Sequence, residues 1–428
     1  MNYQNYTKEA LQAELEACLK DYEVQKNKGL SLDLSRGKPS SEQLNLSNGV
    51  LDTLTSQSNF ILANGMDVRN YGGLEGIPEA RTFFADVLDT KFDNIMVAGN
   101  SSLTLEYSIM SHAMTDGLCG EKPWMFVEDR KWLCPAPGYD RHFAITEHFG
   151  FELITVPMTL EGPDMDVIES LVANDASIKG VWCVPKYQNP MGITFSDEVV
   201  KRFAALKPAA KDFRIFWDNA YCVHDFYSDR HDELLDIISE AEKAGNPDIV
   251  YEFTSTSKMA FPGGGITGFA ASVNNIKDVK SYMTYATIGP DKINQLRQVL
   301  YFKDKANVMK HMQRLADVIR PKFELTLDIF DKELEGRGIA KWTKPLGGYF
   351  ISFDTFPGCA TKIVKMCKDA GVTFTGAGAT YPYGRNPNDD NIRVAPSYAT
   401  IEDIKPAVDL FVLCVKIVSI EKILADKA

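Results

Sequence analysis

Short apolar runs alternate with longer helical stretches through the middle of the chain. The runs expected to form strands are Asn94–Ala98, Trp124–Glu128, Glu152–Val156, Gly180–Val184, Phe213–Trp217, Ile249–Phe253 and Ile266–Ser272. Runs that are apolar throughout are typical of parallel strands buried on both faces. The pattern therefore predicts an α/β fold with a large, doubly wound, mostly parallel sheet. In such a sheet, ligands bind at the carboxyl ends of the strands.

The two ends of the chain have a different pattern. Leucines spaced by four predict an amphipathic helix over residues 7–28, with Gly29 as its stop. From about residue 303 the pattern is helical, with a break expected at Pro321. The later part predicts a strand at Tyr349–Asp354, a short helix, a strand at Asn391–Val394 and a closing helix from Ile401 to Ala425 capped by Thr400. This is the pattern of a smaller α+β domain.

Composition and charge narrow the class of protein. The 428 residues carry a net charge of -12, which argues against nucleic acid or an anionic membrane as the main partner. The N-terminus lacks an apolar signal core, and no stretch of about 18 apolar residues occurs. The 8 cysteines are scattered without a C-x-x-C pair, as in reduced cytoplasmic proteins. We therefore expect a cytoplasmic protein.

The histidines give no indication of a metal site. The 6 histidines have no recognisable ligand spacing, so no bound metal is expected. His142 and His148 are expected at a helix cap and on the surface.

Two predicted strands end at residues that carry chemistry. Lys258 follows a run of hydroxyl residues and precedes a glycine cluster. Hydroxyls and glycine amides suit a phosphate, and a lysine amine beside them suits an aldehyde, although an exposed loop lysine is the common alternative. Asp218 ends the strand at Phe213–Trp217, where it is equally consistent with a ligand site and with a helix N-cap.

Other candidate residues lie at further strand ends. Asn189 lies in an Asn-Pro turn after a strand, and Ser101 and Ser102 open a helix whose free amides suit a phosphate. Ordinary turn and cap chemistry are the alternatives. Arg393 lies among apolar residues in a strand and therefore needs an anionic partner, either a ligand or a structural carboxylate.

Taken in order, these motifs resemble those of fold type I pyridoxal-phosphate (PLP) enzymes of the class I/II aminotransferase superfamily. The resemblance extends from Ser35–Pro39 through Tyr71–Gly76 to the Arg393 strand, and it is greatest for a divergent bacterial group of aspartate and MocR-type aminotransferases. It implies residues 1–47 as an N-terminal arm with part of the small domain, 48–302 as the PLP-binding domain and 303–428 as the small domain.

The resemblance also implies roles for individual residues. The implied cofactor site comprises Tyr71 of a neighbouring subunit, Ser101, Ser102, Tyr139, Asn189, Asp218, Tyr221, Ser255, Ser257 and Lys258. Lys258 would hold PLP as a Schiff base and move the substrate proton, and Asp218 would pair with the pyridinium nitrogen. Asn189 and Tyr221 would bond the ring's phenolate oxygen, Tyr139 would stack on the ring, and the serines would hold the phosphate. The contribution of Tyr71 implies a homodimer.

The substrate is expected to be an amino acid, with a 2-oxo acid as acceptor. Arg393 would bind the α-carboxylate as a fork, with Gly37 bringing backbone close to it. The resemblance favours aspartate and 2-oxoglutarate. A cation for the distal carboxylate could be Arg36, Lys38, Lys292 or Arg297.

The chain departs from the family pattern at the expected phosphate site. Many family members have an arginine for the phosphate at the position of Ile266, and the amides of Gly263–Gly265 are the expected substitute.

Three rival functions stay open. They are an aminotransferase for aromatic or neutral amino acids, a PLP lyase acting on cysteine conjugates, and a PLP-sensing regulator. The regulator is disfavoured because only about 30 residues precede Ser35, too few for a helix-turn-helix domain.

Overall fold

The central element of the protein is an eight-stranded sheet, seen in a computed structural model that describes residues 2–427. Its strands, in spatial order, are β2 (Ile95–Ala98), β9 (Thr267–Ala271), β8 (Val250–Ser255), β7 (Arg214–Asp218), β6 (Ile178–Cys183), β3 (Lys131–Ala136), β4 (Glu152–Thr159) and β5 (Gly162–Pro163). The five strands from β8 to β4 run parallel, whereas β2, β9 and β5 pair antiparallel. Every residue of β6, β7 and β8 is buried, which explains why these strands are mainly apolar.

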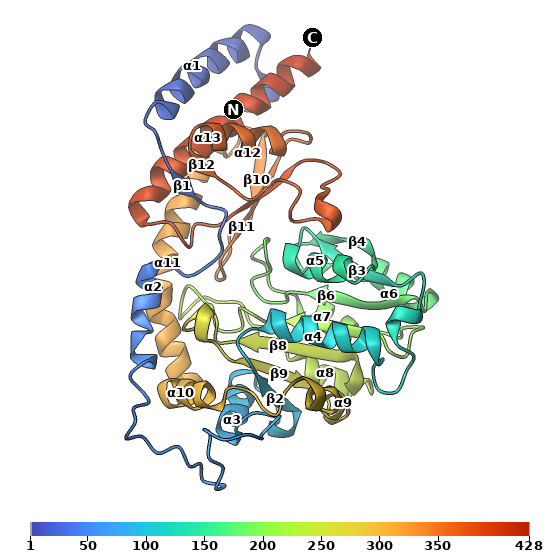
Figure 1. Ribbon diagram of the computed structural model, residues 1–428. Coiled ribbons are helices and arrows are strands. Elements are labelled where there is room, and N and C mark those ends of the chain that lie inside the picture. The colour runs from blue at the N-terminus through green and yellow to red at the C-terminus, as the bar shows by residue number, and fades with distance from the viewer. Residues whose placement is uncertain (1, 428) are drawn as a thin grey trace.

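Helices cover both faces of this sheet (Figure 1). They are α3 (Pro78–Val87), α4 (Ser102–Thr115), α5 (Asp140–His148), α6 (Met165–Asn174), α7 (Asp197–Ala204), α8 (Ile237–Lys243), α9 (Val273–Ala286) and α10 (Lys292–Phe302). Strand β7 shows the two faces directly. Ile215 and Trp217 belong to one buried cluster, and Phe216 between them belongs to the other. The predicted doubly wound, mostly parallel α/β fold is confirmed.

A second group of elements packs around a three-stranded antiparallel sheet (Figure 1). It comprises β10 (Ala340–Trp342), β11 (Ile351–Thr355), β13 (Asn391–Val394), α11 (Lys305–Leu334), α12 (Ala360–Asp369) and α13 (Ile401–Asp426). The N-terminal segment joins it through α1 (Lys8–Lys26), which packs on α13, and through β1 (Leu32–Asp33), which pairs with β12 (Val372–Thr373). Short elements complete the chain: α2 (Ser41–Leu46), η1 (Tyr3–Asn5), η2 (Asn48–Val50), η3 (Phe92–Asn94), η4 (Trp124–Phe126), η5 (Pro247–Ile249), η6 (Pro262–Gly264) and η7 (Pro382–Gly384).

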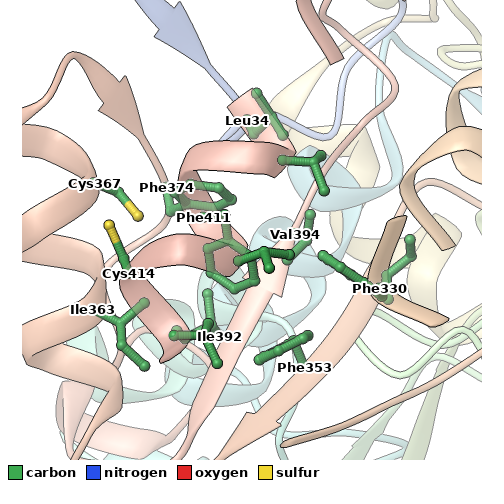
Figure 2. Close-up of a cluster of buried hydrophobic side chains, with 14 of the residues drawn as sticks. Leu34, Phe330, Phe353, Ile363, Cys367, Phe374, Ile392, Val394, Phe411 and Cys414 are labelled. Atoms are coloured by element: carbon green, nitrogen blue, oxygen red, sulfur yellow. The ribbon is translucent and has the colours of Figure 1, made fainter. Parts of the chain in front are cut away.

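One apolar cluster joins these N- and C-terminal segments. In Figure 2, Leu34 from the N-terminal segment lies with Phe330 of α11, Val394 of β13 and Phe411 of α13. All four side chains are fully buried. The division of the chain at residues 47 and 302 stays a prediction.

The terminal helices agree with their predicted starts and stops. The Thr7 hydroxyl accepts a hydrogen bond from the amide of Ala10 at the start of α1, and Gly29 beyond its end has a φ of +66°. The Thr400 hydroxyl accepts from the amide of Asp403 at the start of α13, as predicted. Within residues 2–427, no helix is both long and apolar enough to span a membrane.

Two sequence predictions were wrong. The Trp124–Glu128 run is not a strand: residues Trp124–Phe126 form a 3-10 turn anchored by the Trp124 indole, which donates to Asp212 at 2.7 Å. The strand lies instead at Lys131–Ala136, where Pro135 argues against a central strand in the sequence. The expected break at Pro321 does not occur, because α11 continues through it with Ile319 and Phe323 buried on either side. Tertiary packing thus outweighs the lost backbone hydrogen bond.

Candidate active site

The strand-end residues predicted from the sequence lie along one edge of the large sheet. Asp218 is the last residue of β7, Asn189 follows β6, and Lys258 follows β8. Because β6, β7 and β8 run parallel, their carboxyl ends meet at the same edge. This is the edge at which open α/β sheets bind ligands.

Lys258 lies in the turn that joins β8 to β9, over residues 256–266. The turn is closed by Thr256, whose amide donates to the Ile266 carbonyl and whose hydroxyl accepts from the Ile266 amide, both at 3.0 Å. The Lys258 Nζ lies 5.0 Å from the centroid of the Tyr221 ring. The positive charge of Lys258 also lowers the pKa values of Tyr139 and Glu106, although burial raises both overall. The amine therefore lies among these groups.

Tyr221 connects the amine to the other charged groups of the site. Its ring is buried, and burial raises the pKa of its hydroxyl, with a further increase from Asp218 and a decrease from Arg393. The charges of Asp218 and Arg393 therefore both act on the Tyr221 hydroxyl, and the Tyr221 ring lies beside Lys258. Burial likewise raises the pKa of Tyr139, to about 12. Both hydroxyls are therefore protonated hydrogen-bond donors at neutral pH.

The Asp218 carboxylate has one oxygen beside a histidine nitrogen and one open oxygen. Its Oδ2 lies 3.2 Å from the His142 Nε2. Its Oδ1 is buried and has no hydrogen-bond partner among the described residues. A buried carboxylate oxygen without a partner is costly, so it suits a protonated ring nitrogen of a ligand.

His142 is not the cap or surface residue expected from the sequence. It is 1% exposed, in α5, and its ring stacks on Trp182 with the centroids 4.4 Å apart. Its Nε2 also lies 3.3 Å from Glu106 Oε2 in α4. His148, in contrast, is exposed as expected. The prediction for His142 failed because the turns of α5 place it on the sheet-facing side, three residues after Tyr139.

Arg393 belongs to β13, so it comes to the site from the three-stranded sheet. One guanidinium nitrogen donates to Asp140 at 2.8 Å and to Asn189 at 3.3 Å, and another donates to Thr375 at 3.4 Å. The buried Nε has no partner in the described part of the chain. The arginine thus has a structural carboxylate partner in Asp140, one of the two alternatives expected from the sequence, and keeps an unpaired N–H that suits a ligand carboxylate.

Gly37 supports the arginine indirectly. A Cβ at Gly37 would lie 1.9 Å from the ring of Phe350, and this ring lies 5.0 Å from the Arg393 guanidinium carbon. Only glycine fits this approach, so Gly37 fixes the ring that packs on the arginine.

Ser257 and Gly265, on either side of Lys258 in the turn, both bind Asn100. The Ser257 hydroxyl donates to the Asn100 carbonyl at 3.1 Å, and the Gly265 amide donates to the Asn100 side chain at 2.8 Å. The Gly264 amide donates to Phe261. Two of the three amides in the Gly263–Gly265 run are therefore already used, contrary to their expected role as replacement phosphate donors.

The remaining serines lie close to this turn. Ser101 is the N-cap of α4, Ser102 is its first residue, and Ser255 ends β8. Ile266 is buried, at 1% exposed, and its side chain is apolar. This position therefore supplies no cation. The helix N-terminus and the hydroxyls are the anion-binding groups of this corner.

Tyr71 lines a groove to which none of these residues contributes. Tyr71 is 81% exposed, and the groove, of about 530 Å³, is also lined by Lys292, Ile288 and Arg69. The Lys292 Nζ donates to the carbonyl of Gly72 at 2.8 Å. The sequence prediction assigned Tyr71 to a neighbouring subunit.

The other three cations proposed for a distal carboxylate have different surroundings. Arg36 is paired with Asp33 at 2.9 Å and stays largely exposed. Lys38 lies 4.2 Å from the centroid of the Tyr398 ring. The buried Nε of Arg297 has no partner in the described chain.

Comparison with known proteins identifies the family. The sequence model of the family described as aspartate amino-transferase matches residues 6–427. The chain belongs to this family of aminotransferases. An aspartate aminotransferase of Corynebacterium glutamicum is 44% identical over 397 residues, which cover 92% of this chain and 91% of the relative.

Solved structures of aminotransferases share the fold. The crystal structure of an aspartate transaminase from Corynebacterium glutamicum has a TM-score of 0.96 at 42% identity and covers 99% of both chains. The α-aminoadipate aminotransferase LysN of Thermus thermophilus, complexed with N-(5'-phosphopyridoxyl)-L-leucine, has a TM-score of 0.72 at 19% identity over 94% of this chain and 95% of that chain. The latter likeness shows the fold alone.

Sequence reasoning missed several residues of this aminotransferase site. Asp140 and Thr375 contact Arg393, and Glu106 and Trp182 contact His142. The available signal for Glu106 was its place in α4 beside the apolar residues Leu105 and Ile109, where a carboxylate is unusual. Asp140 gave no signal beyond being next to Tyr139.

Proposed function

We propose that the protein is a PLP-dependent aminotransferase that transfers the amino group of aspartate to 2-oxoglutarate in a ping-pong reaction. The observation that carries the proposal is the set of charged groups around Tyr221. They are an amine (Lys258), a buried carboxylate with one open oxygen (Asp218) and a buried guanidinium with an open N–H (Arg393).

The residues at this sheet edge fit PLP. Asp218 Oδ1 would hold the ring nitrogen, Asn189 and Tyr221 the phenolate oxygen, and Tyr139 the ring face. The N-terminus of α4, with Ser101 and Ser102, and the hydroxyls of Ser255 and Ser257 would hold the phosphate. When bound, PLP supplies an electron sink for the electron pair released at the substrate's α-carbon.

The chain's own residues then have distinct tasks in the reaction. Arg393 orients the substrate through its α-carboxylate, which places the α-hydrogen within reach of Lys258. The Lys258 amine, once released from the cofactor, takes that proton and later returns it. Asp218 holds the proton on the ring nitrogen, because an anion beside a protonated nitrogen raises its pKa.

A dicarboxylate substrate is supported by the cations at two sides of the site. The Thr375 hydroxyl, which accepts from Arg393, donates to the Ser35 carbonyl at 3.1 Å, so the segment carrying Arg36 lies near the arginine. Lys292 lies beside Tyr71 and would come with it from a neighbouring subunit. Both cations are candidates for the distal carboxylate of aspartate.

A homodimer with shared sites is part of the proposal. Tyr71, Tyr285 and Ile288 are 81%, 93% and 62% exposed in the single chain, although aromatic and aliphatic side chains favour burial. A second copy covering them would bring Tyr71 to its neighbour's phosphate. We also propose that residues 48–302 form the PLP-binding domain, with 1–47 and 303–428 in the smaller one.

A panel of amino donors and 2-oxo acids, followed by absorbance, tests this function. Aspartate with 2-oxoglutarate should give the highest kcat/KM. Faster turnover of an aromatic or neutral donor would reject aspartate as substrate. Pyruvate released from a cysteine conjugate without any acceptor would indicate a lyase, and cofactor binding without turnover of any donor would indicate a sensor.

The distal-carboxylate candidates are separated with variants. Arg36→Gln and Lys292→Gln are each compared for aspartate and for alanine, which lacks the distal carboxylate. The variant that raises KM for aspartate and leaves KM for alanine unchanged identifies the cation. Unchanged values in both would exclude these two residues.

A further inference from the structure

Two carboxylates converge on one imidazole nitrogen behind the proposed ring site. His142 Nε2 lies 3.3 Å from Glu106 Oε2 and 3.2 Å from Asp218 Oδ2. Glu106 is 0% exposed and His142 is 1% exposed. Neither oxygen of Glu106 has a well-aligned hydrogen-bond partner among the described residues. A carboxyl in this position destabilises the fold unless a cation stays beside it, so its presence calls for a function.

The charges around this group come from four elements. Glu106 projects from α4, His142 from α5, Asp218 from β7, and Lys258 from the turn after β8. The ring of Tyr139 packs edge-on against the imidazole at 4.8 Å, and Trp182 stacks on its face. The aromatic rings exclude water, so charges inside the group act on one another strongly.

A histidine between Asp218 and the protein interior creates a conflict of charge. If the imidazole were protonated and Asp218 were its sole anion, the pair would be neutral. Little negative charge would then remain at Asp218 Oδ1 for a cationic ring nitrogen. If the imidazole were neutral, Asp218 would lose an ion pair. A second anion removes the conflict.

We propose that Glu106 is a positioning residue that neutralises a protonated His142, so that the Asp218 carboxylate keeps its full charge for a protonated ring nitrogen at Oδ1. The inference rests on the proposed binding of PLP at Asp218. Two carboxylates then balance the charge of two cations, the imidazolium and the ring nitrogen, in one buried group.

The pKa directions agree with this geometry. Burial lowers the pKa of His142, but the Glu106 and Asp218 carboxylates together raise it to about 9. Burial, and then Asp218, raise the pKa of Glu106 to about 7. Between these values His142 is an imidazolium and Glu106 is ionised. A ring cation bound at Asp218 favours ionised Glu106 further and extends this range to lower pH.

The first test uses the apoprotein, and therefore needs no bound cofactor. The ring nitrogens of His142 are followed by NMR against pH in 15N-histidine-labelled protein, with the signal assigned by its loss in His142→Gln. The imidazole should stay protonated through neutral pH. In Glu106→Gln its pKa should fall by about 1–3 units, as expected when an adjacent opposite charge is lost. Glu106→Asp keeps the charge and should recover part of the shift.

The second test compares PLP with its 1-deaza analogue, in which CH replaces the ring nitrogen. Wild-type apoprotein should bind PLP more tightly than the analogue. In Glu106→Gln this preference should fall by about tenfold, equivalent to one pKa unit at the ring nitrogen. Affinity for the analogue should change little. A purely structural role would weaken both ligands equally and leave their ratio unchanged.

Several results would overturn the inference. These are a neutral His142 in the wild-type apoprotein at neutral pH, an unchanged His142 titration in Glu106→Gln, and an unchanged ligand ratio. Because the ligand atoms of the three residues lie within 4.8 Å of one another, stoichiometric Zn²⁺ uptake abolished by Glu106→Gln would also contradict it. If wild-type protein fails to bind PLP, the proposed function fails while the NMR result still stands.

Discussion

At the scale of single residues, the Asp218 carboxylate is the group on which the proposed chemistry depends. One of its oxygens is held near His142, and the other is buried without a partner. An anion that is fixed in place before the ligand arrives stabilises developing charge without having to reorganise. The value of Asp218 lies in this fixed negative charge.

Replacing Asp218 by Asn should therefore lower kcat strongly. The amide keeps the shape but removes the charge, and we expect a loss of about 10²- to 10³-fold, the range for one preorganised electrostatic contact. Steady-state kinetics with aspartate and 2-oxoglutarate measure it. Glu252→Gln is the matched control, since Glu252 is also a buried carboxyl, on the neighbouring strand, and bonds Asn219 instead. Equal losses in both variants would show that buried carboxyls matter here only for folding.

Arg393→Lys tests the second charged residue. Lysine keeps the charge but cannot present two parallel N–H groups to a carboxylate. Losing one charge-assisted hydrogen bond of about 1.5–3 kcal/mol should lower kcat/KM roughly 10- to 150-fold. The measurement is kcat/KM for aspartate, with 2-oxoglutarate saturating. A variant with wild-type kcat/KM would mean that Arg393 serves only its ion pair with Asp140.

At the scale of elements, the parallel strands place the site residues and also bury charge. Strand β8 carries Glu252 in its centre, 4% exposed, where Asn219 donates to it at 2.9 Å. Burial, and then the charge of Asp236, raise the pKa of Glu252 to about 8 from its ordinary 4.5. The folded strand thus contains a neutral carboxyl at neutral pH.

This raised pKa predicts how stability depends on pH. Between pH 4.5 and about 8 the folded state holds a proton that the unfolded state has lost, so the free energy of unfolding falls as pH rises. The contribution is complete below pH 4.5 and lost as pH passes about 8. Urea denaturation midpoints across this window should decline less steeply in Glu252→Gln than in wild type. Parallel slopes would mean that Glu252 is already ionised in the folded protein.

The same strands explain which features the sequence could predict. Strands β6, β7 and β8 are buried on both faces, so each consists mainly of apolar residues, with Lys179, Arg214 and Glu252 as the charged exceptions before the strand ends. Asp218 was found because it ends such a strand. Strand β3 was missed because Pro135 interrupts its pattern. Burial alone therefore does not make a strand recognisable, because β3 is almost entirely buried and was missed, whereas β4 is partly exposed and was predicted.

The helical side of the site could not be predicted for a different reason. Glu106 and His142 lie on separate helices, 36 positions apart, and meet only because both helices pack on the same sheet. The place of Glu106 among apolar residues of α4 indicates burial, but nothing in the sequence indicates its partner. Asp140 likewise meets Arg393 only when the small sheet approaches α5. Contacts of this kind depend on the packing of elements, which single-sequence patterns do not contain.

At the scale of the whole molecule, we propose that each site takes residues from two chains. Tyr71 is exposed and lies in the groove beside Lys292, and Lys258 does not line this groove. A symmetric dimer would exchange these residues between two sites. Sharing of the sites between two chains can be tested by mixing two variant proteins.

Mixing two inactive variants should restore activity if the sites are shared. Lys258→Ala lacks the amine, and Tyr71→Ala should have a weakened hold on the cofactor phosphate of its neighbour. A mixed dimer has one site in which both residues are intact. After dissociation and reassociation of equal amounts, activity should reach about a quarter of wild type, since half of random dimers carry one intact site. Sedimentation analysis checks that dimers form. Activity no higher than that of the parent variants would place both residues in the same chain's site or remove Tyr71 from the site altogether.

The central claim, that Lys258 carries out amino transfer on a cofactor held at the edge of the large sheet, is tested most directly by a spectrum. Purified wild-type protein with bound PLP is mixed with aspartate alone while the visible absorption band is followed. We predict that the band shifts within one turnover and that 2-oxoglutarate restores it, and that Lys258→Ala loses both changes on the timescale of turnover. A Lys258→Ala protein that cycles through both changes at the wild-type rate would contradict the claim.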